Sequence, residues 1–286
     1  MKVGKGSIGG LTFVVGVLVI SALGIMAVGA LAAGLTGDEI LQKVDDEAAS
    51  LDEGSLISVV QFDNVYADGT SSSNLFAGLG KKIEGQPEES LIYFKQPEDV
   101  AGTIFLSVKP VGEDARMWLY LPALGMAKEL VAEQQKQSFA GSTFSYKDMG
   151  NRSYADKYAA KLVGEETLTI GDEQRACYVL ELTARPGTDE DYPTSKAWVD
   201  KESFLMLKSE DYNESGNLER TMDVLSLTTF DGQLLADKML ATNTVDESST
   251  TITFVKRERP KSEIPDSVFD PNNLAEFDPD TFGLSD

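Results

Sequence analysis

The stretch Ala115-Arg116-Met117-Trp118-Leu119-Tyr120-Leu121 has the composition of a strand, but its five last residues show no polar alternation. Residues 91–94 and 104–106 have the same character. In a sheet with one face in water, every second side chain is polar. These strands are therefore either covered on both faces by other elements of a core, or one of their faces lines a cavity for an apolar ligand. The residues alone leave both interpretations open.

Around this stretch, the period of the apolar residues after Gly54 is two, which is typical of strands. Turn signals such as Asp68-Gly69 and Asp231-Gly232 separate many of the runs. We expect a mainly β (α+β) domain with one large antiparallel sheet of roughly ten strands, curved or partly closed. The expected strands are 56–66, 91–95, 103–109, 115–121, 177–183, 196–200, 204–212, 218–229, 234–242 and 250–256.

Other segments lack this period. Thr36 and Glu39 form a capping box that predicts a helix over residues 36–52, with apolar residues on one face. Residues 123–158 are expected to hold a short helix near 126–135 and a long loop. The proline-rich tail excludes a central strand after residue 257, and short helical turns are expected at 265–269 and 271–277. Residues 78–82 resemble a phosphate loop only in part, and we interpret them as an ordinary loop.

The N-terminus has the marks of an exported protein. Lys2 and Lys5 precede an apolar run from residue 11 to 35, and small residues at 30–34 suit a signal peptidase. We expect residues 1–33 to be a cleaved signal peptide. Because the run approaches the length that spans a bilayer, an uncleaved anchor formed by residues 11–31 is the alternative. Either arrangement places the rest of the chain in the periplasm or elsewhere outside the cytoplasm.

The composition narrows the possible functions. Without Lys2 and Lys5, 23 basic residues stand against 47 acidic ones, a net charge of −24 that disfavours nucleic acid as a partner. The sequence has no histidine, which excludes Ser-His-Asp catalysis and histidine-ligated metal sites. The single cysteine, Cys177, is interpreted as a small core residue of a strand. We therefore expect neither enzymatic activity nor a cofactor.

Four stretches resemble the LolA-like outer-membrane lipoprotein-sorting proteins, in their larger, non-classical branch. They are residues 116–125, with Tyr-Leu-Pro-Ala-Leu-Gly at their end, residues 138–149, with Ser-Phe-Ala-Gly-Ser at their start, residues 177–182 followed by 198–200, and residues 264–269. The resemblance implies a half-open barrel wrapped around a few helices, with a hydrophobic cavity between them. It also implies a lipid- or lipoprotein-binding domain at 34–275, and an acidic flexible tail is expected at 276–286. One departure is that Leu124-Gly125 is followed by the single basic residue Lys128, where relatives commonly carry a basic cluster.

The role implied by this resemblance is a carrier. It would bind the acyl chains of lipoproteins or lipids and pass them from a membrane-transporter donor to a membrane acceptor. The alternative is a lipid-sensing envelope regulator, or an accessory binding domain of a membrane lipid transporter. The two-sided apolar strands and the resemblance together suggest that one cavity is lined by aromatic and apolar residues of neighbouring strands, with methionines as an adaptable lining. These candidate residues are Phe94, Trp118, Tyr120, Leu180, Trp198, Met206, Met222 and Met239.

Overall fold

The structure, a computed structural model, describes residues 34–150 and 153–284. Apart from Gly34, these residues belong to one compact unit that begins at Leu35. The expected signal peptide or anchor at residues 1–33 lies outside the described residues. Within the described ranges, no helix combines the length and the apolar character needed to cross a bilayer.

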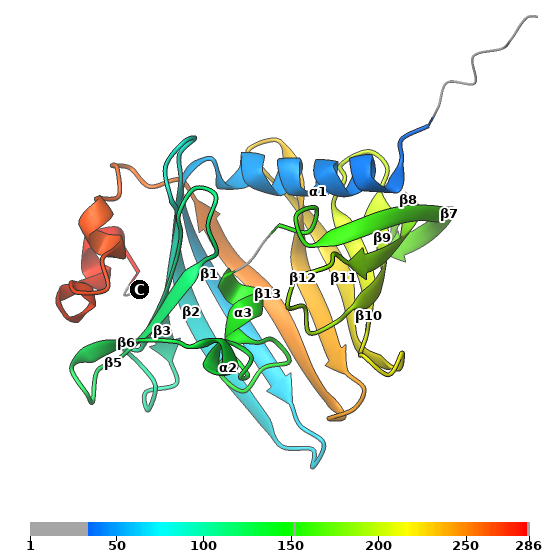
Figure 1. Cartoon of the computed structure of the whole chain (residues 1–286). Helices are drawn as coiled ribbons and strands as arrows, with labels where there is room; N and C mark the ends of the chain where they lie inside the picture. Colours follow the sequence, from blue (N-terminus) through cyan, green and yellow to red (C-terminus); the bar gives the residue numbers. More distant parts are fainter. Residues whose placement is uncertain (1–33, 151–152, 285–286) are drawn as a thin grey trace, which may run out of the picture. The chain divides into compact units, whose positions relative to one another are not determined.

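Thirteen antiparallel strands form a single sheet in this unit, and Figure 1 shows that the sheet is strongly curved. The spatial order is β6-β5-β4-β3-β2-β1-β13-β12-β11-β10-β9-β8-β7, so that β6 and β7 are the two edges. The strands are β1 Gly54–Val65, β2 Ser71–Lys82, β3 Glu88–Gln96, β4 Ile104–Lys109, β5 Arg116–Leu121, β6 Met126–Glu129, β7 Tyr158–Ile170, β8 Glu173–Ala184, β9 Thr194–Asp200, β10 Met206–Tyr212, β11 Leu218–Phe230, β12 Gln233–Asn243 and β13 Ser248–Glu258.

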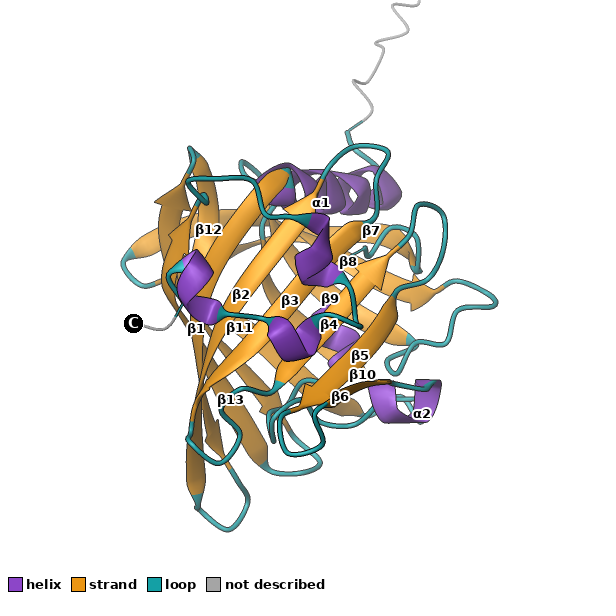
Figure 2. Cartoon of the chain, turned by 90° about the vertical axis from the view of Figure 1, so that its left-hand side faces the viewer, coloured by secondary structure: helices purple, strands orange, loops and turns teal. Residues whose placement is uncertain are grey.

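The helices are few and mostly short. Helix α1 (Gly37–Asp52) runs along one end of the sheet, and the short helices α2 (Ala132–Gln135) and α3 (Tyr146–Gly150) lie within its curve (Figure 1). Three 3-10 turns follow the last strand: η1 (Asp266–Phe269), η2 (Leu274–Glu276) and η3 (Pro279–Phe282). Figure 2 shows this C-terminal segment lying across the side of the sheet formed by β1 to β5. The predicted fold class, a curved antiparallel sheet with few helices, is confirmed.

The predicted helix over 36–52 is also confirmed, together with its capping box. The backbone N–H of Glu39 donates to Thr36 Oγ1 at 3.2 Å, and the N–H of Thr36 donates to Glu39 Oε2 at 2.7 Å. The buried face of α1, which includes Ile40 and Leu41, packs with Leu180 and other side chains of β7, β8 and β9. This packing attaches the helix to the β7 end of the sheet.

All ten expected strands are present, but β2, β6 and β7 were not expected. The interpretation of residues 78–82 as a loop is wrong, because they complete β2, which pairs with both β1 and β3. The run of serines and the two glycines Gly78 and Gly80 hide the strand pattern. The helix expected near 126–135 is partly wrong: Met126–Glu129 is strand β6, and only Ala132–Gln135 is helical.

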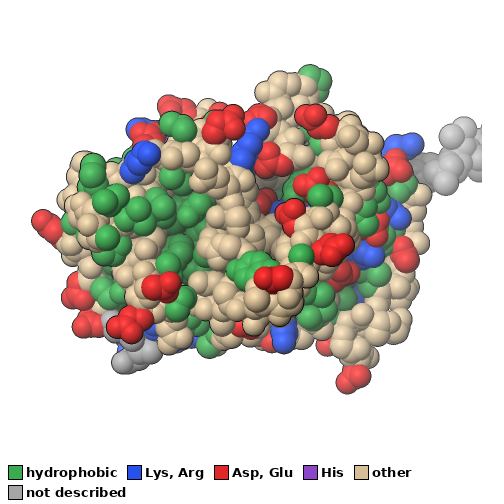
Figure 3. Space-filling model, turned by 90° about the horizontal axis from the view of Figure 1, so that it is seen from below, with side chains coloured by type: hydrophobic (Ala, Val, Ile, Leu, Met, Phe, Trp, Pro, Cys, Tyr) green, Lys and Arg blue, Asp and Glu red, His purple; other side chains and the backbone are tan. Residues whose placement is uncertain are grey.

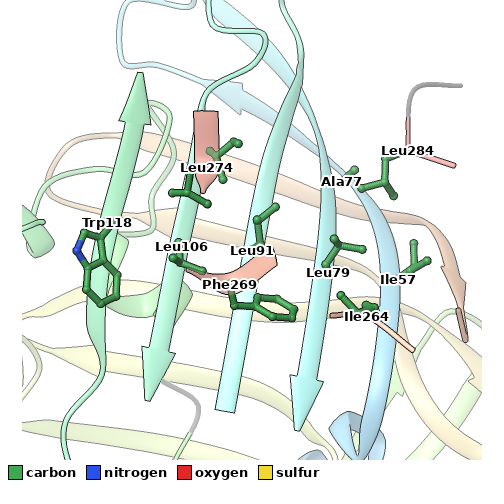
Figure 4. Close-up of a cluster of buried hydrophobic side chains, with 11 residues drawn as sticks. Ile57, Ala77, Leu79, Leu91, Leu106, Trp118, Ile264, Phe269, Leu274 and Leu284 are labelled. Carbon is green, nitrogen blue, oxygen red and sulfur yellow. The ribbon is translucent and has the colours of Figure 1, made fainter. Parts of the chain in front are cut away.

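The C-terminal segment covers one of the two apolar faces of these strands. Figure 4 shows side chains of β1 to β5 meeting Ile264, Phe269, Leu274 and Leu284 from this segment. We call this the outer cluster. Lys81, which is 5% exposed, donates to the carbonyl of Ile264 and forms an ion pair with Asp266. Residues 276–284 belong to this packed segment, where a flexible tail was expected: Phe277 stacks on Phe282, and Leu284 is buried.

Candidate functional site

An apolar cavity of about 220 Å³ lies on the inner face of the sheet. Side chains at every second position of neighbouring strands point toward it, and the register places Val60 opposite Phe76, Gly78 opposite Ile92, and Phe62 opposite Ile252. Phe139 and Met149, from the segment between β6 and β7, also line the cavity. The sheet lining consists of Leu56, Ser58, Val60 and Phe62 on β1, Phe76, Gly78, Leu79 and Gly80 on β2, Ser90 and Ile92 on β3, and Ile252 and Phe254 on β13.

Two glycines of β2 leave space at the sheet side of the cavity. A Cβ atom at Gly78 would lie 2.7 Å from Ser58 Oγ, so glycine allows β1 and β2 to carry these residues side by side. A Cβ at Gly80 would meet only the carbonyl oxygen of Leu56, at 4.0 Å. The missing side chain at Gly80 therefore contributes directly to the empty volume.

We call residues 130–150 the plug, because they lie against the inner face and close one side of the cavity. Phe139 is 1% exposed and is the centre of an aromatic cluster. Its ring centroid lies 5.2 Å from that of Phe76 and 5.3 Å from that of Phe94. Phe62, Phe105 and Tyr146 complete the ring contacts at 6.2, 5.8 and 5.4 Å. Aromatic pairs at such distances stabilise beyond their buried area, so Phe139 holds the plug in place.

Buried polar groups also attach the plug to the sheet. The side-chain amides of Asn64 and Asn74 donate to the carbonyl of Ala140, at 3.5 and 3.4 Å. The backbone N–H of Thr143 donates to Thr250 Oγ1 at 2.9 Å, and that hydroxyl donates to Asn64 Oδ1 at 2.8 Å. Since a buried polar group that loses its partner destabilises the fold, these bonds favour a single position of the plug. The plug is therefore an ordered segment that closes one side of the cavity.

A smaller polar pocket of about 80 Å³ lies beside the apolar cavity, and Asp148 of α3 lines both. Arg220 on β11 donates from Nη1 to Asp148 at 3.0 Å and from Nε to Asp211 at 2.9 Å. Burial by itself would lower the pKa of Arg220, but the carboxylates of Asp148 and Asp211 outweigh it and raise that pKa. The guanidinium therefore remains charged and links the plug to the far half of the sheet.

Three tyrosines line the same polar pocket. Burial raises the pKa of Tyr154 and of Tyr192 to about 12. Burial also raises the pKa of Tyr158, whose hydroxyl donates to the carbonyl of Tyr192 at 3.0 Å. All three therefore stay neutral at physiological pH and offer hydroxyl groups next to Arg220, whose positive charge is balanced by Asp148 and Asp211. In the described ranges, no group of three or more His, Cys, Asp or Glu side chains is placed to hold a metal ion.

The structure does not bring the eight predicted residues into one cavity, and that hypothesis needs correction. Phe94, Met222 and Met239 pack with the aromatic cluster around Phe139. Leu180 and Met206 belong to the cluster beneath α1, and Trp198 belongs to a separate cluster of β8 to β12. Trp118 and Tyr120 lie in the outer cluster under the C-terminal segment. None of the eight lines the apolar cavity, whereas Met206 and Met222 line the polar pocket.

The physical reason is the direction of the strand faces. Alternation correctly places Trp118 and Tyr120 on one face of β5 and Met117 and Leu119 on the other. The inward face is the one that carries Met117 and Leu119. The lining residues of β1, β2 and β13 were missed. A signal existed for Phe139, because it lies in the Ser-Phe-Ala-Gly-Ser stretch that carries the resemblance. For Gly78 and Gly80 the sequence gives no such signal.

Comparison with known proteins supports the same architecture. A DUF1329 family protein from Desulfovibrio piger is 25% identical, with a TM-score of 0.74 over 82% of this chain and 95% of that chain. A domain from Vibrio parahaemolyticus, described as an outer membrane lipoprotein-sorting protein domain, is 26% identical, with a TM-score of 0.71 over 84% and 98%. A LolA superfamily protein from Nitrosomonas europaea, 19% identical, shares the fold with a TM-score of 0.63 over 82% and 98%. A comparison with curated proteins finds no match.

The fold and the inner cavity thus define a half-open barrel of the LolA superfamily type. A family model described as an uncharacterised protein family matches residues 86–276, more than half of the chain. The chain therefore belongs to the family of this model. The structural matches confirm the resemblance to LolA-like lipoprotein-sorting proteins that was seen in the sequence.

Proposed function

We propose that the domain is an extracytoplasmic carrier that holds an acyl chain of a lipid or lipoprotein in the apolar cavity between the sheet and the plug. The observation that carries this proposal is the cavity itself, with aliphatic and aromatic side chains on β1, β3 and β13, a glycine gap on β2, and Phe139 and Met149 on the opposite side. The fold shared with a lipoprotein-sorting domain supports it. The signal-like segment at 1–33 supports a location outside the cytoplasm.

The energetics of such a carrier need no chemical step. Each methylene removed from water contributes about 0.8 kcal/mol, so an acyl chain leaves a membrane at a useful rate only if another apolar site receives it. The free energy of transferring the acyl chain from the membrane to the carrier is then close to zero. The direction of transfer depends on a donor in one membrane and a better-binding acceptor in another. The proposed partners are therefore a lipidated protein or lipid, a membrane-transporter donor and a membrane acceptor.

The volume of the cavity limits how much of an acyl chain fits while the plug lies against the sheet. A dry apolar cavity of roughly 150 Å³ accommodates a benzene molecule. The cavity of about 220 Å³ therefore takes the terminal part of an acyl chain. A longer part requires the plug, and Phe139 in particular, to move away from the sheet.

The test fills the cavity at Gly80. We compare wild type, Gly80→Leu and the control Gly164→Leu on β7, where an added Cβ meets no atom within 4 Å. The protein used is residues 34–286, because the four buried clusters that the described residues form lie within this range. After delipidation, it is titrated with a fluorescent fatty acid. Gly80→Leu should weaken binding by more than about tenfold, since leucine takes the place of several methylenes.

Gly164→Leu should bind like wild type, and circular dichroism should show that both variants remain folded. A wild type that takes up no fatty acid would overturn the proposal. Equal affinity of Gly80→Leu and wild type would mean that the fatty acid binds elsewhere in the domain, which contradicts the proposed site.

A further inference from the structure

The hairpin of β5 and β6 presents apolar side chains to water. All residues from Leu121 to Met126 are exposed, and Leu124 and Met126 are 64% and 61% exposed. The turn is ordered: the backbone N–H groups of Leu124 and Gly125 donate to the carbonyl of Leu121 at 2.9 and 3.1 Å. Val131, directly after the hairpin, is 63% exposed. Contiguous exposed apolar side chains are a mark of an interaction site.

The charge distribution narrows the kind of partner. The chain contains 47 acidic residues, yet none lies between Ala115 and Lys128. Lys128 is exposed on β6 beside the apolar turn. Most of the surface of so acidic a domain is repelled by anionic lipid. The hairpin is a place where the domain can approach an anionic membrane without bringing carboxylates to it, and with a cation next to the apolar tip.

In Figure 3, a view from below, hydrophobic side chains gather on the left, and acidic side chains lie around them. This is the side on which β5, β6 and the C-terminal segment lie in Figure 1. We propose that the β5–β6 hairpin is a membrane-contact element, which inserts Leu124 and Met126 into the interface of a bilayer that contains anionic lipid. Apolar tips with a basic flank bind such interfaces by burial of apolar area together with electrostatic attraction.

The hairpin is joined directly to the plug. Leu130, the first residue of the plug, is 6% exposed and its N–H donates to the carbonyl of Met117 at 2.8 Å. Only α2 and a short turn separate it from Phe139. A carrier that touches a membrane through this hairpin therefore brings the plug near the bilayer. The membrane contact of the hairpin is a separate proposal from acyl-chain binding in the cavity. The two are measured in different experiments, so one can fail while the other holds.

The first experiment places a dye on the hairpin. Cys177 is 0% exposed, so a cysteine introduced by Leu124→Cys in residues 34–286 is the labelling site. Its matched control is Val245→Cys on the β12–β13 turn, since Val245 is 61% exposed. Each variant carries an environment-sensitive dye and is mixed with vesicles of phosphatidylethanolamine and phosphatidylglycerol. The emission of the dye at 124 should shift to the blue and be quenched by bilayer-embedded quenchers, and the dye at 245 should not respond.

The second experiment removes the apolar tip without a label. Leu124→Ser with Met126→Ser should reduce flotation with the same vesicles by about tenfold or more, because burial of two such side chains is lost. Val111→Ser with Val245→Ser removes two equally exposed apolar residues elsewhere and should float like wild type. Absence of a response at 124, or equal responses at 124 and 245, would overturn the proposal. A hairpin that binds no vesicle would then be a candidate for protein docking.

Discussion

Arg220 and Asp148 connect two parts of the domain that are 72 residues apart in the sequence, at a distance of 3.0 Å between Nη1 and Oδ2. Asp148 lies on α3 of the plug, and Arg220 lies on β11 of the opposite half of the sheet. The same aspartate accepts hydrogen bonds from the N–H and the hydroxyl of Ser145, at 2.8 and 2.9 Å. One carboxylate thus orders the start of α3 and ties it to the sheet.

Replacing this arginine should be costly. Arg220→Met leaves Asp211, whose side chain is 9% exposed, and Asp148 without their cation. Removal of one partner of a buried pair typically destabilises by about 3–5 kcal/mol. We expect a loss of about 3 kcal/mol in the free energy of unfolding by urea. The control is Arg116→Met: both partners of its pair with Glu129 are exposed, so the loss should be much smaller than that of Arg220→Met. Equal losses would contradict the assigned role of Arg220.

The buried tyrosines predict an alkaline loss of stability. The pKa of Tyr154 is raised to about 12 in the folded protein, whereas an unfolded tyrosine titrates near pH 10. Between these values the folded state binds more protons, so stability is full below about pH 10 and falls as the pH rises toward 12. The slope for one such group is at most about 1.4 kcal/mol per pH unit. Tyr154→Phe should flatten this fall, and parallel curves for variant and wild type would contradict the prediction.

Gly37, at the start of α1, makes a close contact with the β7 edge. A Cβ there would lie 2.7 Å from the backbone nitrogen of Leu162 and even closer to the carbonyl of Ala160. Backbone atoms of a strand cannot move away easily, so Gly37→Ala should destabilise by about 1–3 kcal/mol despite the better helix propensity of alanine. Gly34→Ala meets no atom within 4 Å and should change stability by less than about 0.5 kcal/mol. Thermal and urea unfolding of the two variants tests this contrast.

Local patterns in the sequence were sufficient for most elements of the fold. The capping box at Thr36 and Glu39 is a contact within four residues, and alternation within a strand is equally local. They predicted α1 and ten strands without knowledge of the tertiary structure. The strand β2 was not predictable in this way, because Gly78 and Gly80 are explained only by the neighbouring Ser58 and by the cavity.

The orientation of the strands required information that no local pattern contains. Trp118 and Tyr120 share a face, as alternation demands, but that face is outward because Ile264, Phe269 and other residues of the C-terminal segment cover it. This covering segment is more than 140 residues away from β5 in the sequence. Both interpretations of the apolar strands are partly right. Their outer faces are packed in the outer cluster. Of their inner faces, that of β3 lines the cavity through Ile92, whereas Phe105 of β4 and Met117 of β5 pack in the aromatic cluster.

The sharpest test of the plug is Phe139→Ala. Removal of a phenylalanine that is 1% exposed should lower the free energy of unfolding by about 3–5 kcal/mol and at the same time enlarge the cavity. Under the proposed function, the variant should bind longer fatty acids more tightly than wild type does. A ligand that binds only the folded state raises the melting temperature, so the ligand-induced shift should increase with chain length more steeply in the variant.

Phe269→Ala supplies the matched control for this experiment. Phe269 is 3% exposed and belongs to the outer cluster, so its removal should cost a similar amount of stability without touching the cavity. Its ligand-induced shift should therefore follow that of wild type at every chain length. If both variants respond alike, the change reflects lower stability alone, and Phe139 does not limit the size of the ligand. If only Phe139→Ala gains affinity for long chains, the plug sets the length of the acyl chain that the closed domain can hold.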